Sequence, residues 1–179
     1  MSVNLPRKTR SIASLILILS LSATGCGESE NKKKREYAIP SALCGVNVDS
    51  STLEPFLPSG KEIRLIHEET DSYRWRCSVS VDGKIFFEVK RERWEQGWSA
   101  RRFATVHAYV EPEHETPDKT YVYSDLGGIG VVRCPPPEYD QDLFIVAKTK
   151  ENKDDHKAMK ELLASYREEL LRSDPCADQ

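Results

Sequence analysis

Four widely spaced cysteines constrain the fold of this chain more than any other feature: Cys44, Cys77, Cys134 and Cys176. Zinc sites usually take their cysteines from close pairs with two to four residues between them, and none of these four has such a neighbour. An even number of cysteines in an exported protein predicts disulfides instead. How the four are used therefore depends on whether the chain is exported.

The N-terminus bears on export. Arg7, Lys8 and Arg10 precede an apolar run over residues 12–21, and small residues then lead to Cys26. A basic start, a short apolar segment and small residues are typical of a secretory signal peptide. A cysteine directly after the small residues is typical of a lipoprotein signal. We expect cleavage before Cys26 and lipidation of its thiol by diacylglyceryl, with fatty acids such as palmitate, because two acyl chains anchor stably.

Two alternatives to lipidation remain open, a transmembrane anchor and ordinary secretion. The apolar stretch has about ten to fourteen residues, whereas a spanning helix needs roughly twenty. Ala23 stands where bacterial lipoprotein motifs usually carry leucine. The sequence favours the lipoprotein interpretation.

The chain divides into a signal peptide over residues 1–25, a flexible polar and basic tether over 26–38, and one globular domain over 39–179. The tether has no apolar periodicity, and its basic run is either a spacer or a contact with anionic lipid. The net charge of the whole chain is −3. Since the signal carries three positive charges and no acids, the mature chain is near −6 (−3 − 3). This balance argues against nucleic-acid binding.

Hydrophobic periodicity predicts an α+β fold. Alternating side chains favour strands, an Asp82-Gly83 pair is typical of a hairpin turn, and helical spacing follows Gly97-Trp98-Ser99. We expect one or more antiparallel sheets in a βββαβββα-like order, packed against helices and stapled by two disulfides. The expected strands are 62–69, 72–82, 84–91, 119–124, 129–134 and 143–148, and the expected helices are 51–54, 100–111 and 153–172.

Geometry favours one of the three possible disulfide pairings. A strand of about eight residues after Cys134 spans roughly 26 Å, and a final helix of about twenty residues returns roughly 30 Å. That return brings Cys176 close to Cys134 and leaves Cys44 to meet Cys77. The other pairings remain open.

The search for catalytic chemistry identifies no motif. His107 shares an apolar stripe with Phe103, which favours a hydrogen-bonded core histidine over a metal ligand paired with Glu111. His114 and Glu115 form a similar pair without a third ligand. We therefore predict no catalytic residues, no metal and no cofactor.

Two further motifs have alternative interpretations. The glycine-rich residues 126–130 superficially resemble a phosphate loop, but such loops lead into a helix, and a hairpin turn is favoured. Trp94 and Trp98 are possible ligand contacts that could stack on a sugar ring or a partner protein. The alternative is a hydrophobic lid where strand meets helix.

The segments around the cysteines, Ile39–Gly45, Trp75–Cys77, Gly130–Cys134 and Ser173–Cys176, resemble a family of uncharacterised lipoproteins from Gram-positive bacteria. The resemblance covers most of the mature chain. It implies an exported α+β domain anchored to the membrane, and it supplies no activity and no catalytic residues.

The expected function is that of a binding or interaction module on the extracytoplasmic face of the cell membrane. Its partners would be the membrane, through the lipid, and a protein or cell-wall component. The first alternative is an enzyme or accessory factor acting on cell-wall glycan. A substrate-capturing receptor for a transporter is less favoured, since the domain is small for a two-lobed receptor.

Overall fold

The computed structural model describes residues 34–71, 74–135, 139–150 and 155–177, so the expected signal peptide and Cys26 lie outside the described residues. Within them, a seven-stranded antiparallel sheet and a two-stranded hairpin pack with three α-helices. The α+β class is therefore confirmed. None of the helices in these ranges has the length and apolar character needed to cross a bilayer.

The elements follow one another in nearly the expected order. The three strands before the middle helix, the three before the last helix and both helices are confirmed, whereas the short strands β1, β2 and β6 were not predicted. The bounds are β1 (Ala42–Leu43), β2 (Val46–Asn47), α1 (Ser50–Leu53), the 3-10 turn η1 (Glu54–Phe56), β3 (Ile63–Asp71), β4 (Arg74–Val81), β5 (Lys84–Glu95), α2 (Ala100–Phe103), the π-helical turn η2 (Ala104–Ala108), β6 (His114–Glu115), β7 (Tyr121–Tyr123), β8 (Gly127–Val132), β9 (Gln141–Thr149) and α3 (His156–Leu171).

The strand order in the large sheet is β3-β4-β5-β9-β8-β7-β6. The two strand groups join where β5 pairs with β9, from Phe87 opposite Thr149 to Glu95 opposite Gln141. β9 has an uninterrupted apolar run because both of its faces are buried. It is therefore the central strand on which both helical layers meet.

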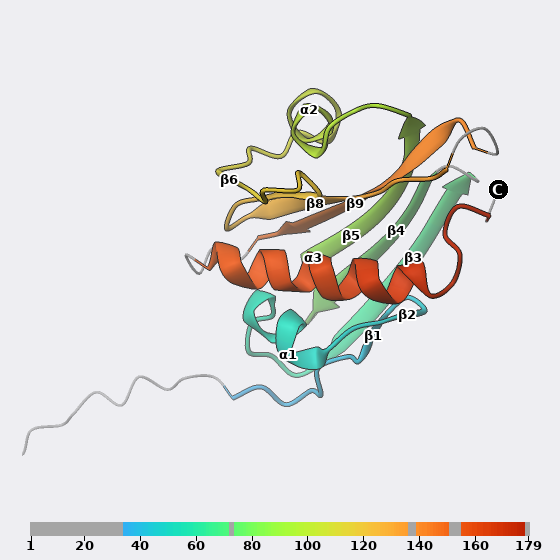
Figure 1. Ribbon diagram of the computed structural model, residues 1–179. Helices are drawn as coiled ribbons and strands as arrows, with labels where there is room; N and C mark the ends of the chain where they lie inside the picture. The colour runs from blue at the N-terminus through green and yellow to red at the C-terminus, as the bar shows by residue number, and fades with distance from the viewer. Residues whose placement is uncertain (1–33, 72–73, 136–138, 151–154, 178–179) are drawn as a thin grey trace, which may run out of the picture. The chain divides into compact units, whose positions relative to one another are not determined.

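Helices cover both faces of this sheet (Figure 1). On one face lie α3, α1 and the β1–β2 hairpin, and on the other lies α2 with η2. In the first layer, the predicted apolar stripe of α3 is buried, which confirms that helix. Its members are Met159, Leu162, Leu163, Tyr166 and Leu170. In the second layer, Phe103 stacks on Phe144 of β9 with ring centroids 4.1 Å apart.

Two disulfides join Cys44 to Cys77 and Cys134 to Cys176, with Cα atoms 5.8 and 5.7 Å apart. The pairing favoured by the sequence is confirmed. The first bond fixes the β1–β2 turn to β4, and the second fixes the segment after α3 to the end of β8. Each bond ties a peripheral element to the sheet and restricts the unfolded chain.

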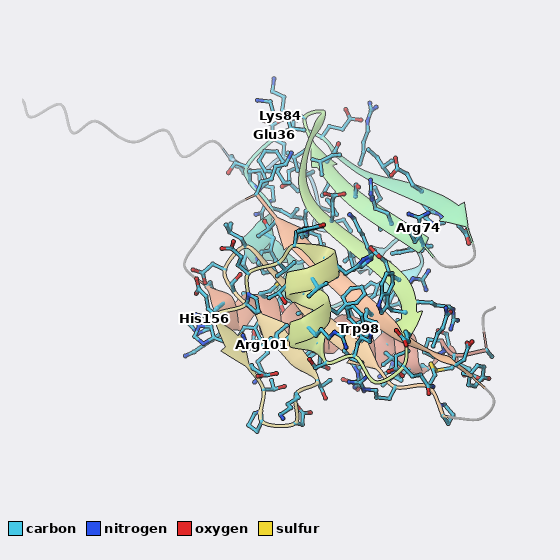
Figure 2. The ribbon with its side chains drawn as sticks, turned by 90° about the horizontal axis from the view of Figure 1, so that it is seen from above. Glu36, Arg74, Lys84, Trp98, Arg101 and His156 are labelled. Atoms are coloured by element: carbon cyan, nitrogen blue, oxygen red, sulfur yellow. A yellow bond between two sulfur atoms is a disulfide. The ribbon has the colours of Figure 1, made fainter. Side chains whose placement is uncertain are left out.

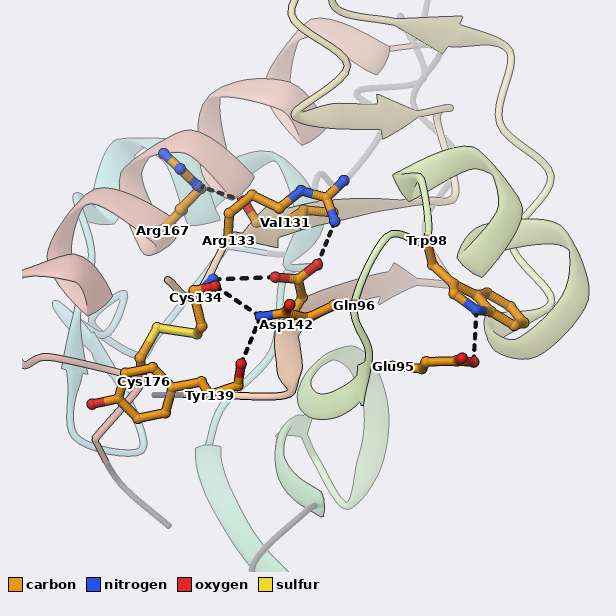
Figure 3. Close-up of polar contacts among 10 residues, drawn as sticks. All are labelled: Glu95, Gln96, Trp98, Val131, Arg133, Cys134, Tyr139, Asp142, Arg167 and Cys176. Atoms are coloured by element: carbon orange, nitrogen blue, oxygen red, sulfur yellow. Dashed lines mark hydrogen bonds and ion pairs between the residues drawn. A yellow bond between two sulfur atoms is a disulfide. The ribbon is translucent and has the colours of Figure 1, made fainter. Parts of the chain in front are cut away.

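A network of hydrogen bonds surrounds Cys134 (Figure 3). Asp142 of β9, whose side chain is 3% exposed, accepts a hydrogen bond from the Cys134 backbone N–H at 3.1 Å and forms an ion pair with Arg133. The side-chain amide of Gln96 donates to the backbone carbonyls of Cys134 and Tyr139 at 2.9 and 3.0 Å. The second disulfide therefore rests on a fixed backbone.

Part of the segment expected to be a tether contacts the folded domain. Within residues 26–38, Arg35 donates to the Glu54 carboxylate at 2.7 Å, and the Glu36 backbone N–H donates to the Gly60 carbonyl at 2.8 Å. These bonds hold the described end of that segment beside η1.

The middle helix departs from expectation at its end. Ser99 caps its N-terminus, accepting a hydrogen bond from the Arg102 N–H at 3.1 Å. The helix was expected to continue to 111, but it widens into the π turn η2 and stops at Ala108. Tyr109 adopts a left-handed conformation with φ +51° and ends the helix there. The predicted end was wrong because this backbone reversal has no marker such as glycine in the sequence.

Both predicted hairpin turns are present. Asp82 and Gly83 have φ angles of +49° and +80°, the combination that a type I′ turn requires. Asp125 and Leu126 form the turn between β7 and β8, where the Ser124 N–H donates to the Gly127 carbonyl at 2.8 Å. The glycine-rich residues from Gly127 onward belong to strand β8, so the segment does not lead into a helix.

Candidate functional site

An open cleft of about 470 Å³ lies where β5 and β9 meet the π turn η2. It combines two arginines, two glutamates, an indole and an imidazole. In the view from above, Arg74 lies on the side of the strands that α2 leaves uncovered (Figure 2). The cleft is lined by Arg74, Glu92, Arg93, Trp94, Glu95, His107 and Gln141.

His107 is held in this cleft by a carboxylate. Its Nε2 atom lies 2.7 Å from the Oε2 atom of Glu92, and the two side chains are 32% and 16% exposed. An ionised carboxylate only accepts, so the imidazole N–H donates. The predicted hydrogen-bonded histidine is confirmed, with the difference that it borders a cleft and keeps part of its ring accessible.

The π turn η2 sets the position of His107. A π turn shifts the residues that follow it relative to a regular α-helix, and such turns are frequent at functional sites. The Nζ atom of Lys148 on β9 donates to the Ala108 carbonyl at 2.6 Å, which fixes the end of the turn. Burial lowers the pKa of Lys148. The turn is therefore attached to the sheet at both His107 and Ala108.

Trp94 forms the aromatic wall of the cleft. Its ring centroid lies 3.9 Å from that of His107 and 5.6 Å from that of Trp98, which meets it edge-on. The Arg102 guanidinium lies 3.8 Å from the centroid of the Trp98 ring, and the Trp98 indole N–H donates to Glu95 at 3.3 Å (Figure 3). The structure thus brings the two predicted tryptophans together and already uses part of each ring for internal packing.

The two tryptophans differ in what they offer a ligand. Both pack against the second of the two hydrophobic cores, the one between the sheet and the layer of α2 and η2, as a hydrophobic lid would. Trp94 also lines the cleft, whereas Trp98 does not. Contact of either ring with a ligand stays a prediction, and the geometry favours Trp94.

The Trp94 indole N–H is buried and has no hydrogen-bond acceptor among the described residues. Buried donors are nearly always paired with protein, water or a ligand. The nitrogen atom itself is covered by the protein, so this N–H is not a binding group exposed in the cleft.

A smaller hollow of about 80 Å³ adjoins the cleft and shares Arg74 and Glu92 with it. It adds two cations, Arg76 and Lys90. Arg93, in contrast, is 9% exposed and donates to the Pro175 carbonyl at 2.8 Å, so it serves the fold. The cationic side of the cleft is therefore the one that faces β4.

The other histidines form a separate cluster that sequence reasoning missed. The His114 and His156 rings stack with centroids 4.0 Å apart, and Tyr123 lies 5.4 Å from His114. Asp125 Oδ1 lies 3.8 Å from His156 Nδ1. The His156 ring is partly covered because the start of α3 lies against His114 of β6.

The sequence contains two histidine–glutamate pairs of the kind that can bind a metal, His107 with Glu111 and His114 with Glu115. Among the described residues, no three His, Cys, Asp or Glu side chains are arranged to hold a metal ion.

The comparisons with known proteins give no relative. The chain matches no protein-family model, no curated protein and no solved structure.

Proposed function

We propose that this chain is an exported binding module, anchored through a lipid on Cys26 to the extracytoplasmic face of the cell membrane. The two disulfides support export, because such bonds persist in oxidising compartments. The signal-like N-terminus and the lipoprotein resemblance point the same way.

The observation that carries the binding role is the cleft beside His107. It offers an aromatic wall at Trp94, a hydrogen-bonded imidazole and accessible cations on the β4 side. Ligand sites combine apolar surface with a few polar groups that fix orientation. A ligand suited to this cleft has a flat or apolar part for Trp94 and a carboxylate or phosphate for Arg74.

Binding fits this site better than cysteine-based catalysis. All four cysteines in the described chain are joined in disulfides, so none of them is a free thiolate nucleophile. The group that His107 Nε2 contacts is the carboxylate of Glu92. A general base in an acyl-transfer enzyme would instead contact a nucleophile.

Action on cell-wall glycan is the second candidate function, and one observation favours it. Trp94 lines the cleft beside the pair of His107 and Glu92, and an indole is a suitable platform for a sugar ring. This candidate requires turnover or glycan binding that depends on Trp94.

Titration of residues 34–179 tests the cleft. This part contains every described element, both cores and both disulfides. Defined muropeptides, free stem peptide and glycan strands serve as probes, with tryptophan fluorescence and calorimetry as readouts. We expect a probe with a carboxylate to bind and His107→Ala or Trp94→Phe to weaken it about tenfold, whereas His114→Ala, outside the cleft, leaves binding unchanged. Equal binding by all three variants would refute the cleft as the site.

The anchor is tested separately in the full chain. Cells fed an alkyne-labelled palmitate should incorporate label into the protein, and Cys26→Ser should abolish both the label and the membrane association. Cys44→Ser is the matched control and keeps the label. An unlabelled full-length protein in the cytosol would contradict the proposal.

A further inference from the structure

Strand β3, Ile63–Asp71, forms one edge of the seven-stranded sheet (Figure 1). It pairs with β4 on one side, and no described strand pairs with it on the other. An unpaired edge offers a row of backbone donors and acceptors to another strand. Natural edge strands are usually short or interrupted. β3 is nine residues long, and its register with β4 is regular from Ile63 to Glu69, with an irregularity between Glu69 and Asp71.

The register with β4 determines which residues face outward. The Asp82 N–H donates to the Glu62 carbonyl at 2.9 Å, and this pair continues the register in which Ile63 lies opposite Val81. Hydrogen-bonded and non-hydrogen-bonded pairs alternate along an antiparallel ladder. The even-numbered residues of β3 therefore bond to β4. The odd-numbered residues direct their backbone groups outward: Ile63, Leu65, His67 and Glu69.

These outward groups limit how a second copy of the chain can pair. Two identical strands related by a two-fold axis perpendicular to the sheet run antiparallel, and outward-facing residues must lie opposite outward-facing residues. One residue of β3 must then lie directly opposite its own copy in the partner, with the axis between the two copies. This residue is the centre of the pairing. Each possible centre gives a different set of facing side chains.

The centre at Ile66 gives complementary pairs. Ile66 lies opposite the partner's Ile66, Arg64 lies opposite the partner's Glu68, and Leu65 lies opposite the partner's His67. The first two are non-hydrogen-bonded pairs, in which side chains lie closest. Opposite charges and aliphatic side chains facing each other stabilise a sheet.

The neighbouring centres are unfavourable. A centre at Arg64 or at Glu68 places like charges directly opposite each other. A centre at Leu65 places Glu62 opposite the partner's Glu68, and a centre at His67 places Ile66 opposite the partner's Glu68. Like charges directly opposite destabilise a pair of strands. The centre at Ile66 also places Ile63 opposite the partner's Glu69, but among these centres it alone places Arg64 opposite Glu68, so the charge order favours it.

Exposure on β3 is consistent with burial by such a partner. Leu65 and Ile66 are each 40% exposed, and they lie on opposite faces of the sheet. Arg64 already contacts Glu62, and Glu68 contacts Arg76, but in both pairs the side chains are 44% exposed or more. Exposed ion pairs contribute little, so they rearrange readily when a new strand approaches.

We propose that β3 is a dimerisation strand, through which two copies of this chain join their sheets into one continuous antiparallel sheet centred on Ile66. The dimer is proposed without reference to the ligand cleft, which is lined by residues of β4, β5, β9 and η2.

Sedimentation equilibrium on residues 34–179 tests the dimer. We expect a concentration-dependent dimer that Ile66→Lys weakens by about tenfold or more, because two lysines then face each other. Val106→Lys is the control, since Val106 is 59% exposed on η2, away from β3. Circular dichroism shows that both variants are folded. A protein that stays monomeric at millimolar concentration, or equal effects of the two variants, would overturn the proposal.

Cysteine cross-linking tests the register. Directly opposed residues in a non-hydrogen-bonded pair have Cα atoms about 4.5 Å apart, within the range of a disulfide. Ile66→Cys alone should therefore give a covalent dimer under mild oxidation. Arg64→Cys and Glu68→Cys should cross-link only when mixed. Leu171→Cys, on a 44% exposed residue of α3, is the control. A dimer that cross-links at residue 171 and not at 66 would contradict this interface.

Discussion

His107 Nε2 and Glu92 Oε2 lie 2.7 Å apart and connect the π turn η2 to strand β5. This contact joins the helical cover of the second core to the sheet at the edge of the cleft. Both side chains are mostly buried, so the bond is made in an environment where an unpaired charge is costly.

The energetic contribution of this pair can be separated with a double-mutant cycle. Glu92→Leu removes the acceptor and should lower the free energy of unfolding by about 1–3 kcal/mol. His107→Phe leaves the carboxylate unpaired and should have a similar effect. The double variant should lose less than the sum of the two, because replacing both partners by apolar groups is nearly neutral. Urea unfolding measures all four proteins, and additive losses would show that the pair contributes no coupling.

Gly128 provides the close approach between β8 and its neighbours. A Cβ atom at this position would lie 2.6 Å from Leu163 Cδ1 and 2.9 Å from the Val122 carbonyl oxygen. The leucine can move, but the carbonyl belongs to the paired strand and cannot. Gly128→Ala should therefore cost about 1–3 kcal/mol of stability through overpacking.

Gly130→Ala is the matched control on the same strand. Its Cβ would lie 3.3 Å from the Tyr121 ring, so a small shift of that side chain relieves the contact. We expect this variant to lose less stability than Gly128→Ala in urea unfolding. The reverse order would show that α3 and β7 adapt more easily than the packing indicates.

Local sequence patterns were sufficient for several elements of the fold. β4 alternates apolar and polar side chains at its start, the Asp82-Gly83 turn has a strong signature, and the stripe of α3 repeats at helical spacing. Each of these signals depends on residues close together in the chain. The disulfide between Cys134 and Cys176 could be predicted because strand and helix lengths alone return the chain to its starting point.

Contacts between distant segments were not predictable in this way. The pairing of β5 with β9 decides which residues surround the cleft, and no local pattern specifies it. Glu92 and Trp94 share one face of β5, but their proximity to His107 requires knowing that η2 packs on that face. The stack of His114 on His156 was missed for the same reason.

Asp118 gives a pH dependence whose sign follows from its contacts. The hydroxyls of Thr116 and Thr120 and the Thr120 N–H donate to its carboxylate and hold the pKa of Asp118 at about 2, below its usual 3.8. The folded state therefore binds this proton more weakly than the unfolded state does. The stability it contributes is present above about pH 4 and is lost as the pH falls through 2.

Asp118→Asn tests that contribution. The variant should have a lower melting temperature than the parent at pH 6, and the difference should shrink as the pH is lowered toward 2. Scanning calorimetry across this range measures both proteins. A difference that is constant with pH would show that the carboxylate charge does not stabilise the turn between β6 and β7.

The two disulfides close segments of similar length, with sequence separations of 33 and 42 residues. In the chain-entropy model each restricts the unfolded state by about 4 kcal/mol, so removal of either should lower stability by a similar amount.

The local effects of removing the two disulfides should differ. Removing Cys134–Cys176 by paired alanine substitution should free the end of α3, whereas Gln96 and Asp142 still hold the backbone at position 134. Removing Cys44–Cys77 should instead free the β1–β2 hairpin. Urea unfolding gives the two stabilities, and amide hydrogen exchange locates the loosened segment. Equal loosening of α3 in both variants would contradict this separation.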